Sequence, residues 1–195
     1  AIVTGGGAGM GNAHSMLLGA RGANVIVNDV NREAAEATAA AVVAAGGSAQ
    51  AVIEDASTWD GATRLVNAAL DTYGRIDIVV ANAAIINMTA MADMTPENFD
   101  KLFRVNAHGP FYLALAVWPH MVKQRYGRMV LISSGAATAG EPKLAHYSAA
   151  KGAVMGMVRT MALEGKPDNI HVNGLFPVAF TAMMAGSDYN DGEEE

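Results

Sequence analysis

The sequence contains no cysteine, which excludes disulfide bonds and thiolate chemistry. It also has no apolar run of the roughly 18 residues that a membrane span requires, since residues 111–118 lie between Pro110 and Pro119. Basic residues are few: 13 Lys and Arg stand against 19 Asp and Glu, which gives a net charge of −6. We therefore expect a cytoplasmic protein whose partners include neither nucleic acid nor an anionic membrane surface.

Aromatic residues make up only 6% of the chain and charged residues 16%, whereas 51% of the residues are hydrophobic. A chain of 195 residues with this composition can bury one sizeable core. We expect a single domain over residues 1–184, followed by an acidic tail or part of a loop at residues 185–195. The five histidines show no ligand spacing, so no metal site is expected.

Strand-like and helix-like segments alternate along the chain, without internal repeats or a long linker. The expected strands are residues 1–4, 24–28, 48–53, 76–81, 128–133 and 170–176. The expected helices are residues 10–21, 31–45, 58–73 and 145–163, with two helices, or one broken near residue 108, between residues 93 and 126. This alternation predicts an α/β fold with a doubly wound parallel sheet, helices on both faces and ligands at the carboxyl ends of the strands.

A glycine-rich turn follows the first expected strand and leads into a helix. Its pattern is Thr-Gly-x-x-x-Gly-x-Gly, formed by Thr4, Gly5, Gly9 and Gly11, and Met10 stands where the Gly-x-Gly-x-x-Gly pattern would need a glycine. Glycines let the main chain approach a pyrophosphate closely, and the N–H groups at a helix start attract its oxygens. The turn therefore indicates a phosphate-binding site.

An acidic residue ends the second expected strand. Asp29 lies eighteen residues beyond Gly11, where its carboxylate can accept hydrogen bonds from an adenosine ribose and would repel a 2′-phosphate. We therefore expect NAD rather than NADP, although Arg32 is close enough in sequence to keep NADP open. By itself Asp29 could instead cap a helix, and Asp55 could cap the helix that begins near Thr58.

Tyr147 and Lys151 lie four residues apart on an expected helix, so they share one face about 6 Å apart along its axis. A phenol titrates near pH ~10, and a nearby cation favours its phenolate form. Lys151 can supply that cation, and Ser134 lies thirteen residues upstream of Tyr147. This spacing indicates proton exchange with an alcohol or ketone.

Taken together, these residues resemble the short-chain dehydrogenase/reductase family, and the resemblance covers residues 1 to about 184. It rests on the order and spacing of a set of positions: the glycine turn, Asp29, Asp55-Ala56, Asn82-Ala83-Ala84, Asn106, Ser134, Tyr147, Lys151 and Pro177. The sequence departs from the family pattern at Ala84, where Asn-Ala-Gly is usual, and at Val178, where Pro-Gly is usual. Both departures fall where the main chain would line the cofactor pocket.

The resemblance implies a Rossmann-like fold and a role for each of these positions. Asn106, Ser134, Tyr147 and Lys151 would be catalytic: Tyr147 exchanges the proton, Ser134 holds the substrate oxygen, Lys151 lowers the pKa of Tyr147 and binds the nicotinamide ribose, and Asn106 supports a water that connects Lys151 to solvent. The cofactor would contact Gly5, Gly9, Met10, Gly11, Asp29, Asp55, Ala56, Asn82, Ala83, Ala84, Tyr147, Lys151, Pro177, Val178 and Thr181. Met88, Met91, Met94, Met183 and Met184 would border the substrate pocket.

The family fold also has a lid after the sixth strand and a seventh strand, and both are expected to be missing here. By the same resemblance, the helices at residues 111–118 and 145–163 would form a homodimer or homotetramer. The leading interpretation is an NAD-dependent oxidoreductase acting on a secondary alcohol or ketone, such as a hydroxysteroid or a hydroxyacyl thioester. The alternative is a non-catalytic NAD-binding or redox-responsive interaction module.

Overall fold

In the computed structural model, which describes residues 1–177, six parallel strands form one sheet in the order β3-β2-β1-β4-β5-β6. Val178 and Thr181 lie outside the described residues. The strands are β1 Ile2–Thr4, β2 Asn24–Asp29, β3 Ser48–Ile53, β4 Ile78–Ala81, β5 Gly127–Ile132 and β6 Ile170–Leu175. Each neighbouring pair is parallel, which confirms the predicted α/β class and the six strands.

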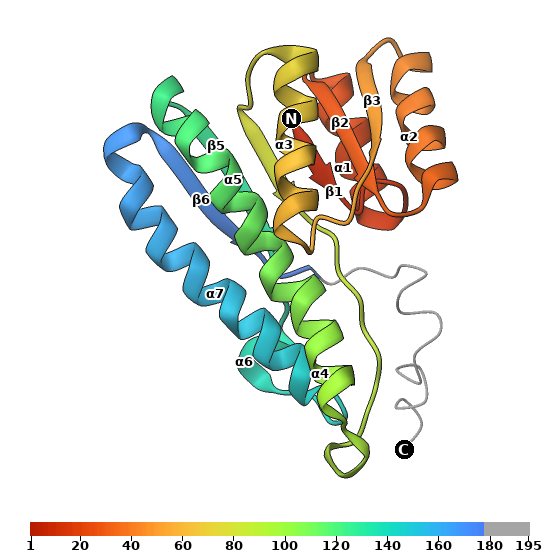
Figure 1. The fold of residues 1–195 in the computed structure, drawn as a ribbon, viewed down its shortest axis with the longest axis vertical. Coiled ribbons are helices and arrows are strands. Elements are labelled where there is room, and N and C mark those ends of the chain that lie inside the picture. Colours follow the sequence, from red (N-terminus) through yellow and green to blue (C-terminus); the bar gives the residue numbers. More distant parts are fainter. Residues whose placement is uncertain (178–195) are drawn as a thin grey trace.

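Helices cover the sheet on both sides (Figure 1). They are α1 Gly9–Ala20, α2 Arg32–Ala44, α3 Trp59–Tyr73, α4 Pro96–Phe103, α5 Gly109–Gln124, α6 Ala136–Ala139 and α7 Ala145–Gly165, with short 3₁₀ turns at Met91–Asp93 and Lys166–Asp168. Helices α1 and α2 pack on β1, β2 and β3, whereas α3, α5 and α7 pack together on the other side of the sheet. The four-residue α6 escaped prediction because it is too short to show a helical period.

The alternation of side chains along the strands divides the interior into two cores. Ile2 and Ile26 belong to the core beneath α3, α5 and α7. Val3 and Val27 point the other way and belong to the core beneath α1 and α2. Since both faces of these strands are buried, they appear in the sequence as continuous apolar runs.

Strand order reverses beside β1, where Ile2 pairs with Ile26 of β2 on one side and with Val79 of β4 on the other. The chain therefore winds outward in opposite directions from β1 and β4. At such a switch point the loops after the two strands diverge and leave a crevice at the carboxyl ends of the strands.

Strand β4 begins at Ile78 rather than at Ile76, where the apolar run starts. The main chain of Ile76 instead bonds to the side chain of Gln124: its N–H donates to Oε1 over 3.1 Å, and its carbonyl accepts from Nε2 over 2.8 Å. These side-chain bonds replace the ladder bonds that the strand would have made. Ile76 is nonetheless buried, which explains its apolar character.

Helices α4 and α5 are joined by a π-helical turn, Arg104–His108, so the expected break takes the form of one wider turn. Thr95 caps α4 through its side chain, which accepts from the N–H of Asn98 over 3.2 Å. Pro110 has no N–H and cannot make the ordinary helical bond to the carbonyl of Asn106. A π-helical turn of this kind is frequent at functional sites.

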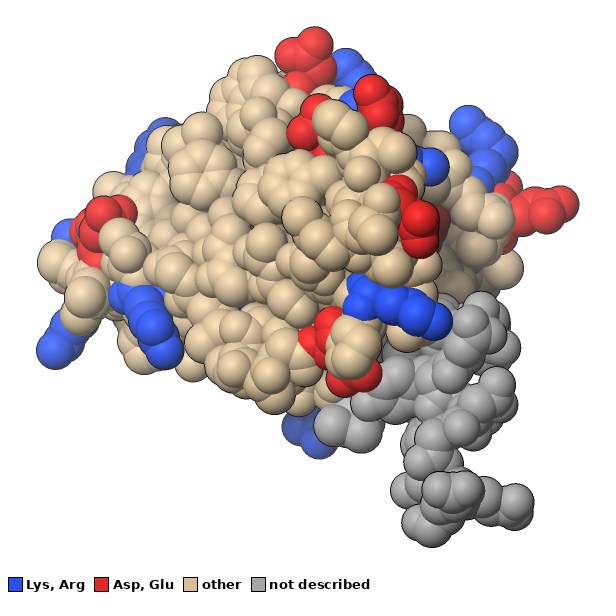
Figure 2. Space-filling model, turned by 90° about the horizontal axis from the view of Figure 1, so that it is seen from below, with Lys and Arg blue, Asp and Glu red and all other residues tan. Residues whose placement is uncertain are grey.

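Charged side chains lie mainly around the margin of the face seen in Figure 2, with uncharged residues across its middle. Within residues 1–177, four ion pairs are present, among them the bidentate pair of Arg64 with Glu54. No helix in this part of the chain is both long enough and apolar enough to cross a membrane.

Candidate active site

The glycine turn places the start of α1 at the crevice. Gly5 and Gly9 have φ of +59° and +51°, a backbone conformation that residues other than glycine rarely adopt. No side chain caps α1 at Ala8, and its first turn carries no acidic residue. The N–H groups of the helix start are therefore available to an anionic ligand.

Gly11 leaves no room for a side chain at this turn. A Cβ atom there would lie 2.0 Å from the carbonyl oxygen of Gly5 and 2.7 Å from Nδ2 of Asn82. The close approach of α1 to the turn thus depends on glycine. A turn pressed against the helix start in this way fits a pyrophosphate cradle.

Asn82 ties the glycine turn to the end of β4. Its Nδ2 donates to the carbonyl oxygens of Thr4 and Gly5, over 3.0 and 3.1 Å. In return, the hydroxyl oxygen of Thr4 accepts from the N–H groups of Asn82 and Ala83, each over 3.1 Å. These four bonds fix the turn after β1 against the segment that follows β4, at the switch point of the sheet.

Asp29 ends β2 and bonds to the main chain of the turn. Its Oδ2 accepts from the N–H of Gly7 and its Oδ1 from the N–H of Asn31, each over 3.0 Å. The N-cap of α2 is Asn31, whose side chain accepts from the N–H of Ala34. Asp29 is therefore not the cap, and its carboxylate stands at the crevice beside the glycine turn.

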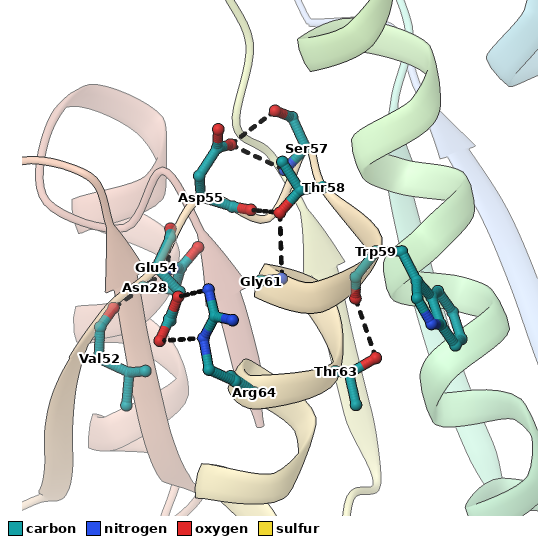
Figure 3. Close-up of polar contacts among 10 residues, drawn as sticks. All are labelled: Asn28, Val52, Glu54, Asp55, Ser57, Thr58, Trp59, Gly61, Thr63 and Arg64. Carbon is teal, nitrogen blue, oxygen red and sulfur yellow. Dashed lines mark hydrogen bonds and ion pairs between the residues drawn. The ribbon is translucent and has the colours of Figure 1, made fainter.

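Asp55 follows β3 and is likewise not a helix cap (Figure 3). Thr58 caps α3 by accepting from the N–H of Gly61 over 3.0 Å, and its hydroxyl donates to the carbonyl of Asp55 over 3.0 Å. The Asp55 carboxylate instead accepts two bonds from Ser57, from its N–H over 3.0 Å and from its Oγ over 2.6 Å. Asp55 itself is exposed.

Lys151 is buried, with 1% of its surface exposed. Its Nζ donates to the carbonyl of Ile132 over 2.8 Å and lies 5.7 Å from the centre of the Tyr147 ring. Burial lowers the pKa of Lys151 to about 8, because a charged amine loses hydration inside the protein. At neutral pH most of the lysine still carries its proton.

The pKa of Tyr147 lies above its ordinary value, mainly because burial disfavours the phenolate, and the side chain of Ser134 offsets part of this rise. The lowering by Lys151 that was expected from the sequence does not contribute to this pKa. In this structure the Lys151 ammonium is directed to the Ile132 carbonyl. The hydroxyl of Ser134 also accepts from the N–H of Ala136 over 3.2 Å.

Asn106 is fully buried in the π-helical turn, and its side chain is committed to Ile85. Its Nδ2 donates to the Ile85 carbonyl over 2.7 Å, and its Oδ1 accepts from the Ile85 N–H over 2.9 Å. The side chain thus fixes the loop after β4. Any water held by Asn106 would therefore bond to its main-chain carbonyl, which Pro110 leaves without the ordinary helical donor.

One pocket of about 900 Å³ brings most of the predicted positions together. Its walls include Gly5, Gly9, Met10, Asp29, Asp55, Ala56, Asn82, Ala83, Ala84, Ser134, Tyr147, Lys151 and Pro177. Gly11 and Asn106 stand behind the wall, where they shape the turn and the loop. Met88 lines the pocket as expected, whereas Met91 and Met94 are not among its lining residues.

Several lining residues were missed by sequence reasoning. They include Ser57, Ile85, Ile86, Lys101, Arg104, Thr138 and Leu144. Most lie in loops or at helix ends, where no period marks the side that faces a ligand. For Ser57, its place directly after Asp55-Ala56 was the one available signal. In the described part of the chain, no three His, Asp or Glu side chains are grouped to hold a metal ion.

His146 precedes Tyr147 and is buried, with 1% of its surface exposed. One ring nitrogen, Nε2, pairs with Oδ1 of Asn87 over 3.0 Å, and the other, Nδ1, has no partner within residues 1–177. The side chain of Asn87 also donates to Thr89 over 3.1 Å. His146 therefore links the start of α7 to the loop that carries Ile85 and Ile86.

Lowering the pH from about 7.5 to about 5.5 should destabilise the fold, partly through His146. Burial lowers the pKa of His146 below its value in the unfolded chain, so the unfolded chain takes up the proton first. The stability that neutral His146 confers is present above pH ~6.5 and is lost as the pH falls through the folded-state pKa. Thermal unfolding at several pH values measures this.

His146→Gln should flatten that pH dependence, because glutamine does not titrate. The flattening should be partial, since burial also lowers the pKa of His14. If stability falls with pH as steeply in the variant as in the wild-type protein, His146 does not contribute to this pH dependence.

The sequence matches the family model described as short chain dehydrogenase over residues 1–192. Peroxisomal multifunctional enzyme type 2 of Mus musculus is 38% identical over 191 residues, and the match covers 93% of this chain and 26% of that protein. Versicolorin reductase stcU of Emericella nidulans is 39% identical over 186 residues, covering 94% of this chain and 70% of that protein. The chain thus spans about a quarter of the first relative and about two thirds of the second.

Two solved structures share the fold. The structure of NAD+-bound xylitol dehydrogenase aligns with a TM-score of 0.85 at 32% identity, covering 90% of this chain and 68% of that chain. A metagenomic short-chain oxidoreductase in complex with NADP aligns with a TM-score of 0.87 at 30% identity, covering 92% of this chain and 81% of that chain. These two proteins thus hold different nicotinamide cofactors.

Proposed function

The chain belongs to the short-chain dehydrogenase family, and on that premise we propose that it is an NAD-dependent oxidoreductase acting on a secondary alcohol or ketone. The observation that carries the proposal is one pocket that contains both the glycine turn and the trio of Ser134, Tyr147 and Lys151. Binding of a nucleotide without catalysis would need the glycine turn but not these three side chains. A tyrosine hydroxyl beside a serine hydroxyl and a buried lysine suits proton exchange with a substrate oxygen.

The pocket walls fit a nicotinamide dinucleotide. The start of α1 and the glycine turn suit its pyrophosphate, Asp29 suits an adenosine ribose, and Asp55, after the next strand of the sheet, would lie near the adenine. Lys151 would reach the nicotinamide ribose. The remaining predicted contacts, from Val178 and Thr181, belong to the same proposal. When bound, the cofactor supplies the hydride chemistry.

In the proposed reaction the protein residues handle the proton. Tyr147 donates its hydroxyl proton to the substrate oxygen in reduction and accepts it in oxidation. Ser134 holds that oxygen through its own hydroxyl, which can donate or accept. Lys151 would bind the nicotinamide ribose, and the carbonyl of Asn106 would hold a water that returns the proton from solvent.

Titration with NADH and NADPH, followed by oxidation of the bound cofactor with a panel of ketones, tests the function. Tight NADH binding with turnover supports the proposal. Binding without turnover on any ketone supports the alternative, a cofactor-binding or redox-responsive module. Absence of binding to both nucleotides would remove the premise that the pocket holds a nicotinamide cofactor.

NADH should bind at least about tenfold more tightly than NADPH, because the Asp29 carboxylate would face the 2′-phosphate. Asp29→Ala should reduce that ratio by weakening NADH binding and removing the repulsion of NADPH. Fluorescence titration of both nucleotides measures the ratio. Asp71→Ala is a matched control, since it makes the same change at an exposed position of α3 that does not line the pocket. Equal binding of the two nucleotides by the wild-type protein would contradict the assignment.

The substrate class, assembly and compartment are part of the same proposal. Ile85, Ile86, Met88 and Leu144 give the pocket an apolar wall, which suits an apolar alcohol or ketone such as a hydroxysteroid or a hydroxyacyl thioester. We extend the proposal to a homodimer or homotetramer, by analogy with the family. A cytoplasmic location is proposed from the lack of cysteine, although the mouse relative is named as a peroxisomal enzyme.

A further inference from the structure

Ser57 holds one carboxylate oxygen of Asp55 from two directions (Figure 3). Its main-chain N–H donates to Oδ1 over 3.0 Å, and its Oγ donates to the same atom over 2.6 Å. Ser57 is buried, with 5% of its surface exposed, whereas Asp55 is exposed. Hydrogen bonds to a charged acceptor are stronger than neutral ones, so this pair restricts the rotation of an otherwise mobile side chain.

A different residue fixes the main chain of Asp55. Its carbonyl accepts from the N–H and the Oγ1 of Thr58, over 3.2 and 3.0 Å. Gly61 packs closely behind that carbonyl, since a Cβ there would lie 2.1 Å from the oxygen. Removing the Ser57 hydroxyl should therefore loosen the Asp55 carboxylate while the turn itself stays in place.

Asp55 lines the pocket that holds the glycine turn, and Ser57 occupies only one of its two carboxylate oxygens. Asp55, Ala56 and Ser57 all line this pocket, and within residues 1–177 Oδ2 of Asp55 has no hydrogen bond. A carboxylate can only accept. The exocyclic amino group of adenine is a donor at the edge of a planar ring, whereas hypoxanthine has a carbonyl oxygen in that position and would be repelled.

We propose that Ser57 is a positioning residue that orients the Asp55 carboxylate toward the adenine amino group of the bound dinucleotide. Selection of adenine over a base with a carbonyl at that position then depends on the Ser57 hydroxyl. This inference rests on the proposed function, because it takes the ligand of the pocket to be a nicotinamide adenine dinucleotide.

The test compares NADH with the reduced nicotinamide hypoxanthine dinucleotide by fluorescence titration. Wild-type protein should bind NADH more tightly. Ser57→Ala should weaken NADH binding roughly 5-fold and leave the hypoxanthine analogue nearly unchanged, so the ratio of the two affinities falls. Ser57→Thr, which keeps a hydroxyl, should restore the ratio. Ser48→Ala, the same change at an exposed position outside the pocket, should leave both affinities unaltered.

A double-mutant cycle tests that Ser57 acts through Asp55. Asp55→Ala should lower the same ratio, and adding Ser57→Ala to it should change the ratio no further. Equal weakening of both nucleotides by Ser57→Ala would overturn the inference, since it would mean direct contact with the nucleotide or a general loss of structure. Should Ser57→Ala not fold, Ser57→Cys keeps the size of the side chain with a much weaker donor.

The two possible failures are distinguishable. A wild-type protein that binds neither nucleotide contradicts the proposed function itself. A wild-type protein that binds NADH, with a ratio that Ser57→Ala leaves unchanged, contradicts only the role of Ser57.

Discussion

Replacing Tyr147 by phenylalanine should lower kcat by roughly 10²–10⁴-fold, the range typical for loss of a general acid–base group. The ring would remain against its neighbours in α4 and α7, so nucleotide affinity and the melting temperature should change little. Only the hydroxyl that exchanges the proton is lost. Steady-state kinetics with a ketone substrate and NADH, together with an NADH titration, measures both quantities.

The matched control for that substitution is Tyr73→Phe. The hydroxyl of Tyr73 lies 3.4 Å from Oγ of exposed Ser48, at the end of α3 and outside the pocket. Its removal should leave kcat unaltered. Full activity in Tyr147→Phe would contradict the catalytic role of Tyr147. Equal losses of kcat in both variants would indicate a general effect on folding.

Gly11→Ala should abolish nucleotide binding and destabilise the protein by at least about 3 kcal/mol, at or beyond the upper end of ordinary overpacking. Its Cβ would overlap the carbonyl oxygen of Gly5, a main-chain atom that the Asn82 side chain holds in place. Relief requires α1 to move away from the turn, which would open the phosphate cradle. Chemical denaturation and NADH titration report the two effects separately.

Gly156→Ala is the matched control, because it makes the same chemical change in the middle of another helix. Apart from Gly156 itself, its two chain neighbours and the nearby backbone of α7, no atom of residues 1–177 lies within 4 Å of the added Cβ, and Gly156 is exposed. We expect this variant to be more stable by about 0.5–1 kcal/mol, since alanine is the better helix former. Near-normal NADH binding by Gly11→Ala would show that the turn tolerates a side chain and does not cradle the phosphates closely.

Positions at the ends of strands could be predicted from the sequence because parallel strands bring them to one edge. Asp29, Asp55 and Asn82 each follow an apolar run, and the pocket contains all three. Helix limits were also close, since caps such as Thr95 and the glycine after α3 mark them locally. These features depend on residues that are neighbours in the chain.

Contacts between distant segments could not be predicted in the same way. The pairing of Asn106 with the main chain of Ile85 joins residues 21 apart, and that of His146 with Asn87 joins residues 59 apart. When a side chain bonds to a main-chain atom, the partner can be almost any residue type, so the sequence does not reveal which residue it is. The pKa of Tyr147 was wrongly anticipated for a related reason, because its burial depends on α4 and α7 packing together.

The Thr4–Asn82 bonds also bear on how the protein folds. They join residues 77 to 79 positions apart, so the loop between them must close before the switch point exists. Closing so long a loop costs conformational entropy, and contacts of high sequence separation slow folding. The βαβ unit of β1, α1 and β2 can form locally, but the cradle for a dinucleotide cannot. Affinity for the nucleotide is therefore a late property of the folding chain, acquired when β4 docks beside β1.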